Sequence, residues 1–209
     1  MDRSFQHITE CGIPGIGNIP FGIHLCHFYP ERQDLVDSLV PYLMTGLRNN
    51  ERCLWITAPP LPADEARAEL AKVLPGLETL IQEERIRIVE ATEWHGNTKR
   101  VDANDISNRW LREEEKALAE GYRGLRITGN TSFLTPEDWD IFMAYESAIN
   151  KTLKKGRRIV ALCSYNRHQC RATDVLEVIQ NHQVTLDRQD RDWEVLREHL
   201  AIRPPSPTK

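Results

Sequence analysis

Apolar runs with the length of buried strands alternate with amphipathic segments along this chain. Short runs rich in Val, Ile and Leu are typical of strands buried on both faces, whereas apolar positions three and four residues apart predict helices. Strand-then-helix units repeat in this way from Phe21 to His182. The predicted strands span residues 21–28, 51–58, 85–91, 122–130 and 157–166. The predicted helices span residues 31–49, 63–74, 105–120, 135–153 and 172–182.

The order of these elements predicts the fold class. Parallel strands need a long crossover connection, which a helix usually supplies. We therefore expect an α/β fold of three layers, in which a mostly parallel sheet of five or more strands carries helices on both faces. Residues 1–20 are interpreted as a flexible leader containing Gly and Pro, and residues 21–187 as one domain. Residues 188–209 are expected to form a short amphipathic helix and a disordered tail.

Composition narrows the classes of partner. The formal net charge of -4 gives no basic surface of the kind that phosphate-backbone binding requires, so we expect no direct contact with nucleic acid. No segment approaches the roughly 18 apolar residues of a membrane-spanning helix, and we expect no membrane contact. The five cysteines show no disulfide-framework spacing, which favours reduced thiols in a cytoplasmic protein.

The residues that would bind a nucleotide phosphate are missing. The glycines of Gly12–Ile19 are spaced as in a phosphate-binding loop, but Asn18 and Ile19 replace its Lys and Ser or Thr, and the segment precedes the first strand. The predicted strand 122–130 ends in Asn130, which lacks the charge needed to hold a magnesium-bound water. Nucleophile-elbow, zinc-protease and dithiol redox motifs are absent as well. We therefore expect a protein that is not an enzyme.

Soft metal ligands stand where the phosphate loop would be. The first predicted strand contains His24, Cys26 and His27, and histidine and cysteine are side chains that divalent ions such as zinc prefer. Their spacing matches no standard zinc motif. The sequence therefore requires no cofactor, and it leaves open a soft divalent metal, such as zinc, bound by His24, Cys26 and Cys163.

Several segments together resemble a known family. They are HLCHFYPERQDLVDSLVPYLMTGLRNNERCLWITA, EGYRGLRITGN, YESAIN and IVALCSYNRHQCRATDVLEVIQNH. Residues 20–185 are similar to the MEDS domain, a sensory domain named from methanogen and methylotroph proteins and from the dichloromethane-responsive repressor. The resemblance implies a RecA/KaiC-like core with a degenerate phosphate loop. It also implies a module that binds small molecules, alone or fused to kinases and DNA-binding regulators. The chain departs from the family at Asn130, often Asp, and after His182.

The resemblance also implies candidate ligand-binding residues. The H-x-C motif of the family falls on His24 and Cys26, and its C-x-Y motif begins at Cys163. In a RecA-like sheet the first predicted strand lies next to the fifth, which would bring these residues near the carboxyl ends of adjacent strands, where open α/β sheets bind ligands. The neighbouring strand and the third strand–helix loop would supply the others. The predicted ligand-binding set is His24, Cys26, Trp94, Arg126, Thr128, Asn130, Cys163 and Tyr165.

Structural interpretations of the same residues stay open. Buried cysteines often only fill space, so Cys26 and Cys163 are also candidates for plain packing. Arg126 is also a candidate for an ion pair with Glu146, the acidic member of the family's Tyr-Glu pair, that would hold a helix to the sheet. His27 points away from His24 in a strand and is expected to cap a helix or lie at the surface.

We therefore expect a sensory protein that binds a small-molecule ligand and signals through a protein partner. That partner would be a kinase, a transcription regulator or a second copy of the chain, and the amphipathic tail around Trp193 is the expected docking element. One alternative is a metal or redox sensor that uses the His and Cys side chains. Another is a residual KaiC-like nucleotide-binding protein.

Overall fold

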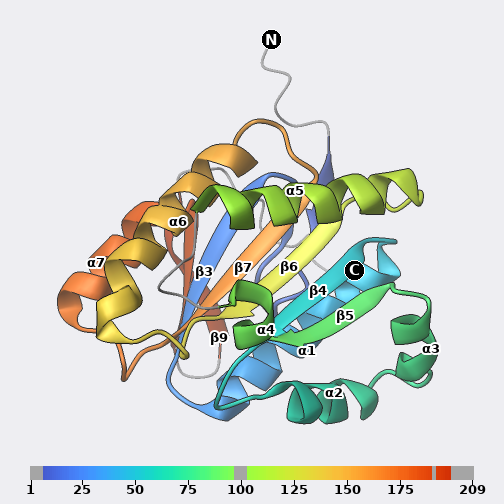
Figure 1. The fold of residues 1–209 in the computed structure, drawn as a ribbon. Helices are drawn as coiled ribbons and strands as arrows, with labels where there is room; N and C mark the ends of the chain where they lie inside the picture. Colours follow the sequence, from blue (N-terminus) through green and yellow to red (C-terminus); the bar gives the residue numbers. More distant parts are fainter. Residues whose placement is uncertain (1–6, 97–102, 190–191, 199–209) are drawn as a thin grey trace.

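The computed structural model describes residues 7–96, 103–189 and 192–198 of the chain. Its centre is a seven-stranded sheet in the order β5-β4-β6-β7-β3-β8-β9 (Figure 1). Neighbouring strands are parallel from β5 to β8, and β9 is antiparallel to β8. The strands of the sheet are β3 (Ile23–Tyr29), β4 (Arg52–Thr57), β5 (Ile86–Glu90), β6 (Leu125–Asn130), β7 (Ile159–Asn166), β8 (Val184–Gln189) and β9 (Asp192–Glu198).

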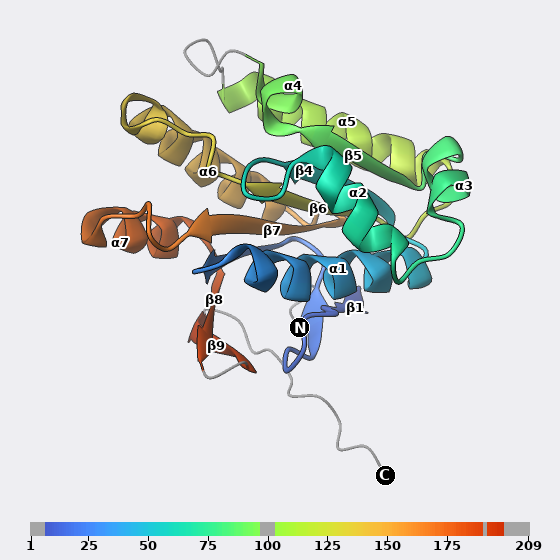
Figure 2. The same cartoon turned by 90° about the horizontal axis from the view of Figure 1, so that it is seen from below.

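Helices cover both faces of this sheet, as the view along the layers shows (Figure 2). One face packs against α1 (Arg32–Arg48), α2 (Ala63–Ala71) and α3 (Leu77–Gln82). The other face packs against α4 (Ala91–His95), α5 (Ala103–Ala119), α6 (Trp139–Leu153) and α7 (Ala172–Asn181), and the short 3-10 helix η3 (Pro136–Asp138) precedes α6. The predicted three-layer α/β architecture is confirmed. The sequence predicts neither of two short helices, α3 and α4, and α4 lies in the expected third strand–helix loop.

Strand register confirms the predicted neighbours. Cys26 of β3 lies opposite Cys163 of β7, and β6 pairs with the other edge of β7. Side chains alternate along β3, so His24 and Cys26 face α6 and α7 whereas His27 faces the α1 side. The expected surface position of His27 is wrong: the side chain is fully buried, with its ring centroid 5.0 Å from that of Trp193. A strand with helices over both faces leaves no position along its middle in contact with water.

The N-terminal segment is part of the folded body from residue 7 onward, so the prediction of a flexible leader over residues 1–20 is wrong there. Strands β1 (Ile8–Glu10) and β2 (Asn18–Pro20) form an antiparallel hairpin. Ile13 and Ile19 of this segment are buried in the same cluster as α1. Gly12 has a φ of +87°, and a Cβ there would lie 2.5 Å from Thr45 Oγ1. The glycines therefore permit a tight turn against α1. Residues 1–6 lie outside the described part.

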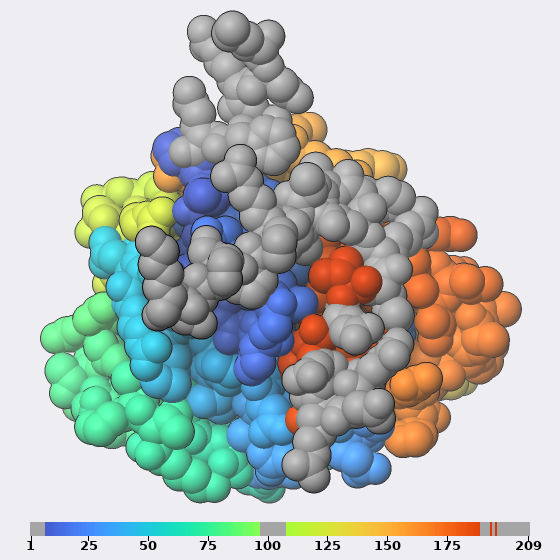
Figure 3. Space-filling model, turned by 180° about the vertical axis from the view of Figure 1, so that it is seen from behind, coloured from blue at the N-terminus to red at the C-terminus, as the bar shows by residue number. Residues whose placement is uncertain are grey.

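The C-terminal segment also differs from the prediction, because β8 and β9 replace the expected amphipathic helix over its described residues. Trp193 is buried in the core, and Val195 is exposed. The pairing itself makes this segment a strand, because β8 supplies an edge and β9 pairs with it antiparallel, with Trp193 opposite Arg188. From behind, the hairpin (blue) lies beside α1 (light blue) and the described part of β9 (red) (Figure 3). The predicted disordered tail falls outside the described part, which ends at residue 198.

Candidate functional site

The turn between β3 and α1 occupies the position of a phosphate loop and carries acidic side chains. Only Pro30 and Glu31 separate the two elements. The backbone N–H of Glu31 donates to Asp34 Oδ2 at 3.0 Å, which places carboxylates at the start of α1. A helix N-terminus attracts anions, so these acidic groups take the place that a phosphate would need. Arg188 of β8 pairs with Asp34 and with Asp37, and this compensates their charge within the protein.

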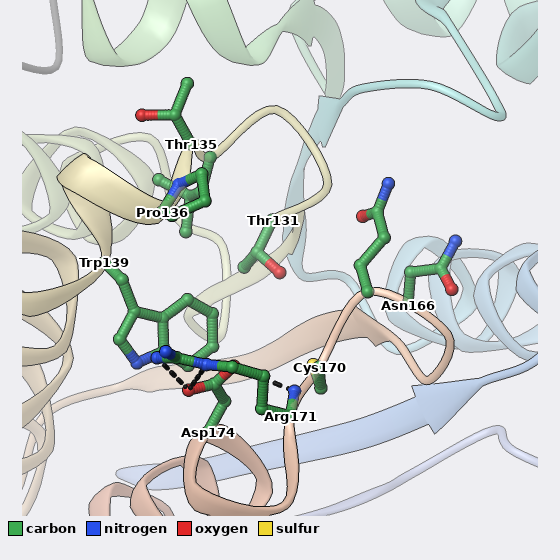
Figure 4. Close-up of a pocket in the computed structure, with 10 residues that line it drawn as sticks. Thr131, Thr135, Pro136, Trp139, Asn166, Cys170, Arg171 and Asp174 are labelled. Atoms are coloured by element: carbon green, nitrogen blue, oxygen red, sulfur yellow. Dashed lines mark hydrogen bonds and ion pairs between the residues drawn. The ribbon is translucent and has the colours of Figure 1, made fainter.

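A hollow of about 430 Å³ opens at the carboxyl edge of the sheet. It lies after the ends of β6 and β7, between the segment that enters α6 and the first turn of α7 (Figure 4). Its lining combines apolar and aromatic surface with a few polar groups. The lining residues are Thr131, Leu134, Thr135, Pro136, Trp139, Asn166, Gln169, Cys170, Arg171 and Asp174.

The charges in this hollow neutralise each other. Arg171 Nη2 lies 2.8 Å from Asp174 Oδ1, and the Arg171 backbone N–H donates to the same carboxylate at 2.8 Å (Figure 4). The indole N–H of Trp139 donates to Glu177 Oε2 at 2.7 Å, so its N–H is already satisfied. Cys170 is half-buried, and burial, together with the Asp174 carboxylate, raises the pKa of its thiol to about 11. A ligand in the hollow would therefore meet the Trp139 ring, the neutral Cys170 thiol and the Arg171–Asp174 ion pair.

A second, fully buried group of polar side chains lies between the sheet and α6. Glu146 Oε2 is 3.1 Å from His24 Nε2 and 3.3 Å from His182 Nε2. Cys163 Sγ is 3.4 Å from His24 Nε2 and 3.7 Å from Glu146 Oε2. None of the four side chains is more than 6% exposed. We call His24, Glu146, Cys163 and His182 the buried quartet.

Burial and mutual contact set the protonation of the quartet. Burial and the neighbouring His182 lower the pKa of His24 to about 4. Burial alone would raise the pKa of Glu146, but hydrogen bonds from His182 and His24 hold it below its usual range. Burial alone would lower the pKa of His182, but the nearby thiols and Glu146 raise it well above its usual value. Burial, followed by Glu146, raises the pKa of Cys163 to about 12. Near neutral pH the quartet therefore holds the Glu146 carboxylate and the His182 imidazolium. The His24 imidazole and the Cys163 thiol are neutral.

Comparison with known proteins identifies the family. The model of the methanogen/methylotroph, DcmR sensory domain, abbreviated MEDS, matches residues 23–183. The chain belongs to the MEDS family. A search of curated proteins found no match. A KaiC-like protein from the hyperthermophilic archaeon Pyrococcus horikoshii is similar in structure, with a TM-score of 0.63 and 15% sequence identity over 92% of this chain and 89% of that chain. At that identity the likeness shows the fold, which is RecA-like.

The MEDS fold brings some predicted site residues together, but away from the open edge. His24 and Cys163 meet in the buried quartet, and Cys26 lies beside them with its thiol 3.4 Å from Thr185 Oγ1. His24 is the second residue of β3 and Cys163 lies within β7, so both are core positions and not carboxyl-edge positions. Tyr165 is buried between the two regions, with its ring centroid 5.8 Å from that of His182 and 6.3 Å from that of Trp139.

The other predicted residues lie elsewhere in this MEDS domain. Arg126 and Thr128 point to the opposite face of the sheet, where Arg126 pairs with Glu51 and not with Glu146. Asn130 does end β6, but its amide group is held by the Tyr29 hydroxyl and by backbone carbonyls. Trp94 is buried in the core beneath α5 and lines neither the hollow nor the quartet.

Sequence reasoning missed the hollow and half of the quartet. The hollow is lined by residues that follow the strands, and no member of the predicted set lines it. Glu146 gave a readable signal, because it falls on the apolar face of α6 beside Phe142 and Ile149, where an acid needs a partner. His182 at the end of α7 gave no such signal.

Among the described residues no helix is long and apolar enough to cross a membrane.

Proposed function

We propose that this MEDS domain is a non-enzymatic sensor that binds a small, uncharged organic molecule in the carboxyl-edge hollow and signals through protein contact. The observation that carries the proposal is a hollow at the edge where open α/β sheets bind ligands. The turn that binds phosphate in other RecA-like proteins carries carboxylates in this chain, which favours a ligand other than a nucleotide. Membership of a sensory-domain family supports the same role.

The size and lining of the hollow favour that ligand class. Its volume of about 430 Å³ falls within the range of small-molecule sites. The Trp139 ring, Leu134 and the Cys170 thiol offer polarizable, weakly polar surface. Arg171 and Asp174 are the charged residues of the lining and pair with each other, so the hollow offers a charged ligand no unpaired opposite charge. An uncharged ligand only has to displace water from apolar surface.

The position of the hollow supports a route for the signal. Its walls include Trp139 at the start of α6 and Asp174 in the first turn of α7, so an occupant changes the spacing of two helices. On the outer surfaces of these helices Ile141 is 44% exposed and Leu176 is 60% exposed. We propose that a partner, a kinase, a transcription regulator or a second copy of this chain, reads the displacement of these apolar side chains.

The Cys170 thiol provides the test, because the other four cysteines are buried. Slow alkylation of the folded protein by iodoacetamide, followed by intact-mass analysis, reports on the hollow, and Cys170→Ser identifies the site. The probes are a graded series of small halocarbons and alcohols that begins with dichloromethane. We expect a member of the series to protect Cys170 in proportion to its concentration, and Trp139→Ala to weaken that protection.

Val73→Ala is the matched control, since it removes an exposed apolar side chain beyond the end of α2. It should leave both the labelling rate and the protection unchanged. Unchanged labelling of Cys170 across the whole series, or equal protection in the wild type and Trp139→Ala, would contradict the proposed site.

A further inference from the structure

The buried quartet has the donor atoms of a metal centre. Two imidazole nitrogens, one carboxylate oxygen and one sulfur converge from four elements, and all four atoms lie within 4.8 Å of one another. His24 comes from β3, Cys163 from β7, Glu146 from α6, and His182 follows the last residue of α7. Fully buried polar side chains need hydrogen-bond or metal partners, and the donor atoms of these four side chains lie close to one another.

The orientation of His182 supports a cation at that point. Its Nδ1 lies 2.7 Å from the carbonyl oxygen of Val178, which can only accept, so Nδ1 carries a proton. Its Nε2 points at Glu146 Oε2, 3.3 Å away, and in the metal-free protein a proton lies between these two atoms. A cation that replaces this proton would be held by Nε2, since metal-binding histidines commonly donate their other ring N–H to a backbone carbonyl.

Four of the six distances between the donor atoms match the edges of a tetrahedral zinc site. Zinc binds nitrogen and oxygen at about 2.0–2.2 Å and sulfur at about 2.3 Å, so tetrahedral ligands lie about 3.4 Å apart, or about 3.6 Å when one is sulfur. The two nitrogen–oxygen distances are 3.1 and 3.3 Å. The two distances that involve sulfur are 3.4 and 3.7 Å. All four agree with those edges to within about 0.3 Å.

We propose that His24, Glu146, Cys163 and His182 bind one transition-metal ion, zinc by preference, in a closed tetrahedral site. The mixture of imidazole, thiolate and carboxylate suits zinc and excludes magnesium and calcium, which prefer oxygen ligands. A thiolate and a carboxylate balance the two charges of the ion, so the core stays neutral. Four protein ligands leave no position for a substrate, and the ion ties β3, β7, α6 and the end of α7 together.

A narrow cavity lies beside two of the four proposed ligands. It has a volume of about 20 Å³, is lined by Cys163 and Glu146 together with Tyr145 and Phe133, and lies at the end of β6. That volume accommodates one water molecule. Tyr165 contacts both His182 and Trp139, which connects the metal site to the wall of the hollow.

Metal analysis of the full chain, purified without chelator and then incubated with zinc, tests the proposal. We expect one zinc per chain, and a fall in the melting temperature after dialysis against a chelator. Replacement of zinc by Co²⁺ should give the intense visible bands of a tetrahedral site and a near-ultraviolet sulfur-to-cobalt band. Both readouts use the wild-type protein, so they do not depend on the folding of a variant.

Variants then assign the ligands. Cys163→Ser should remove the sulfur-to-cobalt band, and His182→Gln should lower zinc affinity at least tenfold, with folding checked by circular dichroism. Cys53→Ser is the matched control, because Cys53 is an equally buried thiol on the opposite face of the sheet. Folded wild-type protein that takes up neither zinc nor Co²⁺ would overturn the proposal and leave the quartet as a proton-bridged network. Binding that persists in both ligand variants would overturn it as well.

Discussion

Replacing Arg126 by Met removes the guanidinium that joins the N-terminal hairpin to the sheet while keeping the length of the side chain. Arg126 Nε donates to Glu51 Oε2 at 2.6 Å, and both side chains are fully buried. Its Nη1 donates to the carbonyls of Cys11 at 2.6 Å and Tyr42 at 3.2 Å, and its Nη2 to that of Glu10 at 2.8 Å. The substitution therefore leaves a buried carboxylate and several carbonyls without their donor.

The size of the effect follows from these contacts. Breaking a buried ion pair by removing one partner costs about 3–5 kcal/mol, because the other charge stays buried and unpaired. Each carbonyl that loses its donor adds about 1–3 kcal/mol where water cannot replace it, and relaxation of the hairpin offsets part of that cost. We expect Arg126→Met to lower the free energy of unfolding by about 3–5 kcal/mol. Combining it with Glu51→Gln should cost less than the sum of the two single changes.

Urea unfolding followed by far-ultraviolet circular dichroism measures the free energy of unfolding of each single variant and of the double variant. Arg126→Lys is the matched control for charge, and it should fall between the wild type and Met, because an ammonium cannot reproduce the several directed bonds of a guanidinium. A loss below about 1 kcal/mol would refute the structural role given to Arg126. If Arg126→Met left the free energy of unfolding unchanged but abolished ligand protection of the Cys170 thiol from alkylation, that role would be refuted too. Arg126 would then have to be counted among the ligand-binding residues.

Further predictions concern the core, the hairpin and the phosphate turn. Burial lowers the pKa of His27 to about 3, so the unfolded chain binds a proton that the folded chain does not. Its contribution to stability is complete above about pH 6.5 and is lost as the pH falls toward 3; in urea unfolding His27→Phe should show a shallower pH dependence than the wild type. Gly12→Ala should destabilise more than Gly121→Ala, by about 1–3 kcal/mol in thermal unfolding, because both have a φ of +87° but only Gly12 faces atoms within 4 Å; equal losses would contradict the packing of the hairpin. Calorimetry with ATP and magnesium should give no binding heat, because Glu31 and Asp34 occupy the start of α1; saturable heat would restore the nucleotide-binding alternative.

The strands and helices could be predicted from the sequence because they depend on local signals, whereas the pairing of β3 with β7 was implied by the resemblance to a RecA-like core. Each strand that enters the core is a short apolar run, and each helix shows an apolar face, so the alternation of elements specifies parallel pairing. The C-terminal strands could not be recognised in the same way. Trp193 is buried and Val195, two residues further on, is exposed, which fits opposite faces of an amphipathic helix better than one face of a strand. Only the edge that β8 offers decides for the strand.

The site was harder to predict, for a geometric reason. Strand alternation correctly separated His24 and Cys26 from His27, yet it could not show how far along the strand the carboxyl edge lies. The hollow is built from segments that follow the strands, and its shape depends on how α6 and α7 begin. The quartet needed Glu146 and His182, whose approach to His24 is a product of helix packing and has no short-range pattern.

A crystal structure with dibromomethane, an isostere of dichloromethane, locates a ligand in this protein unambiguously, because bromine is found by its anomalous scattering. We expect bromine peaks in the carboxyl-edge hollow, in contact with the Trp139 ring and the Cys170 thiol, and their loss in Trp139→Ala crystals of the same form. Bromine found only at other positions, with the hollow of the wild-type protein unoccupied, would contradict the proposed ligand site.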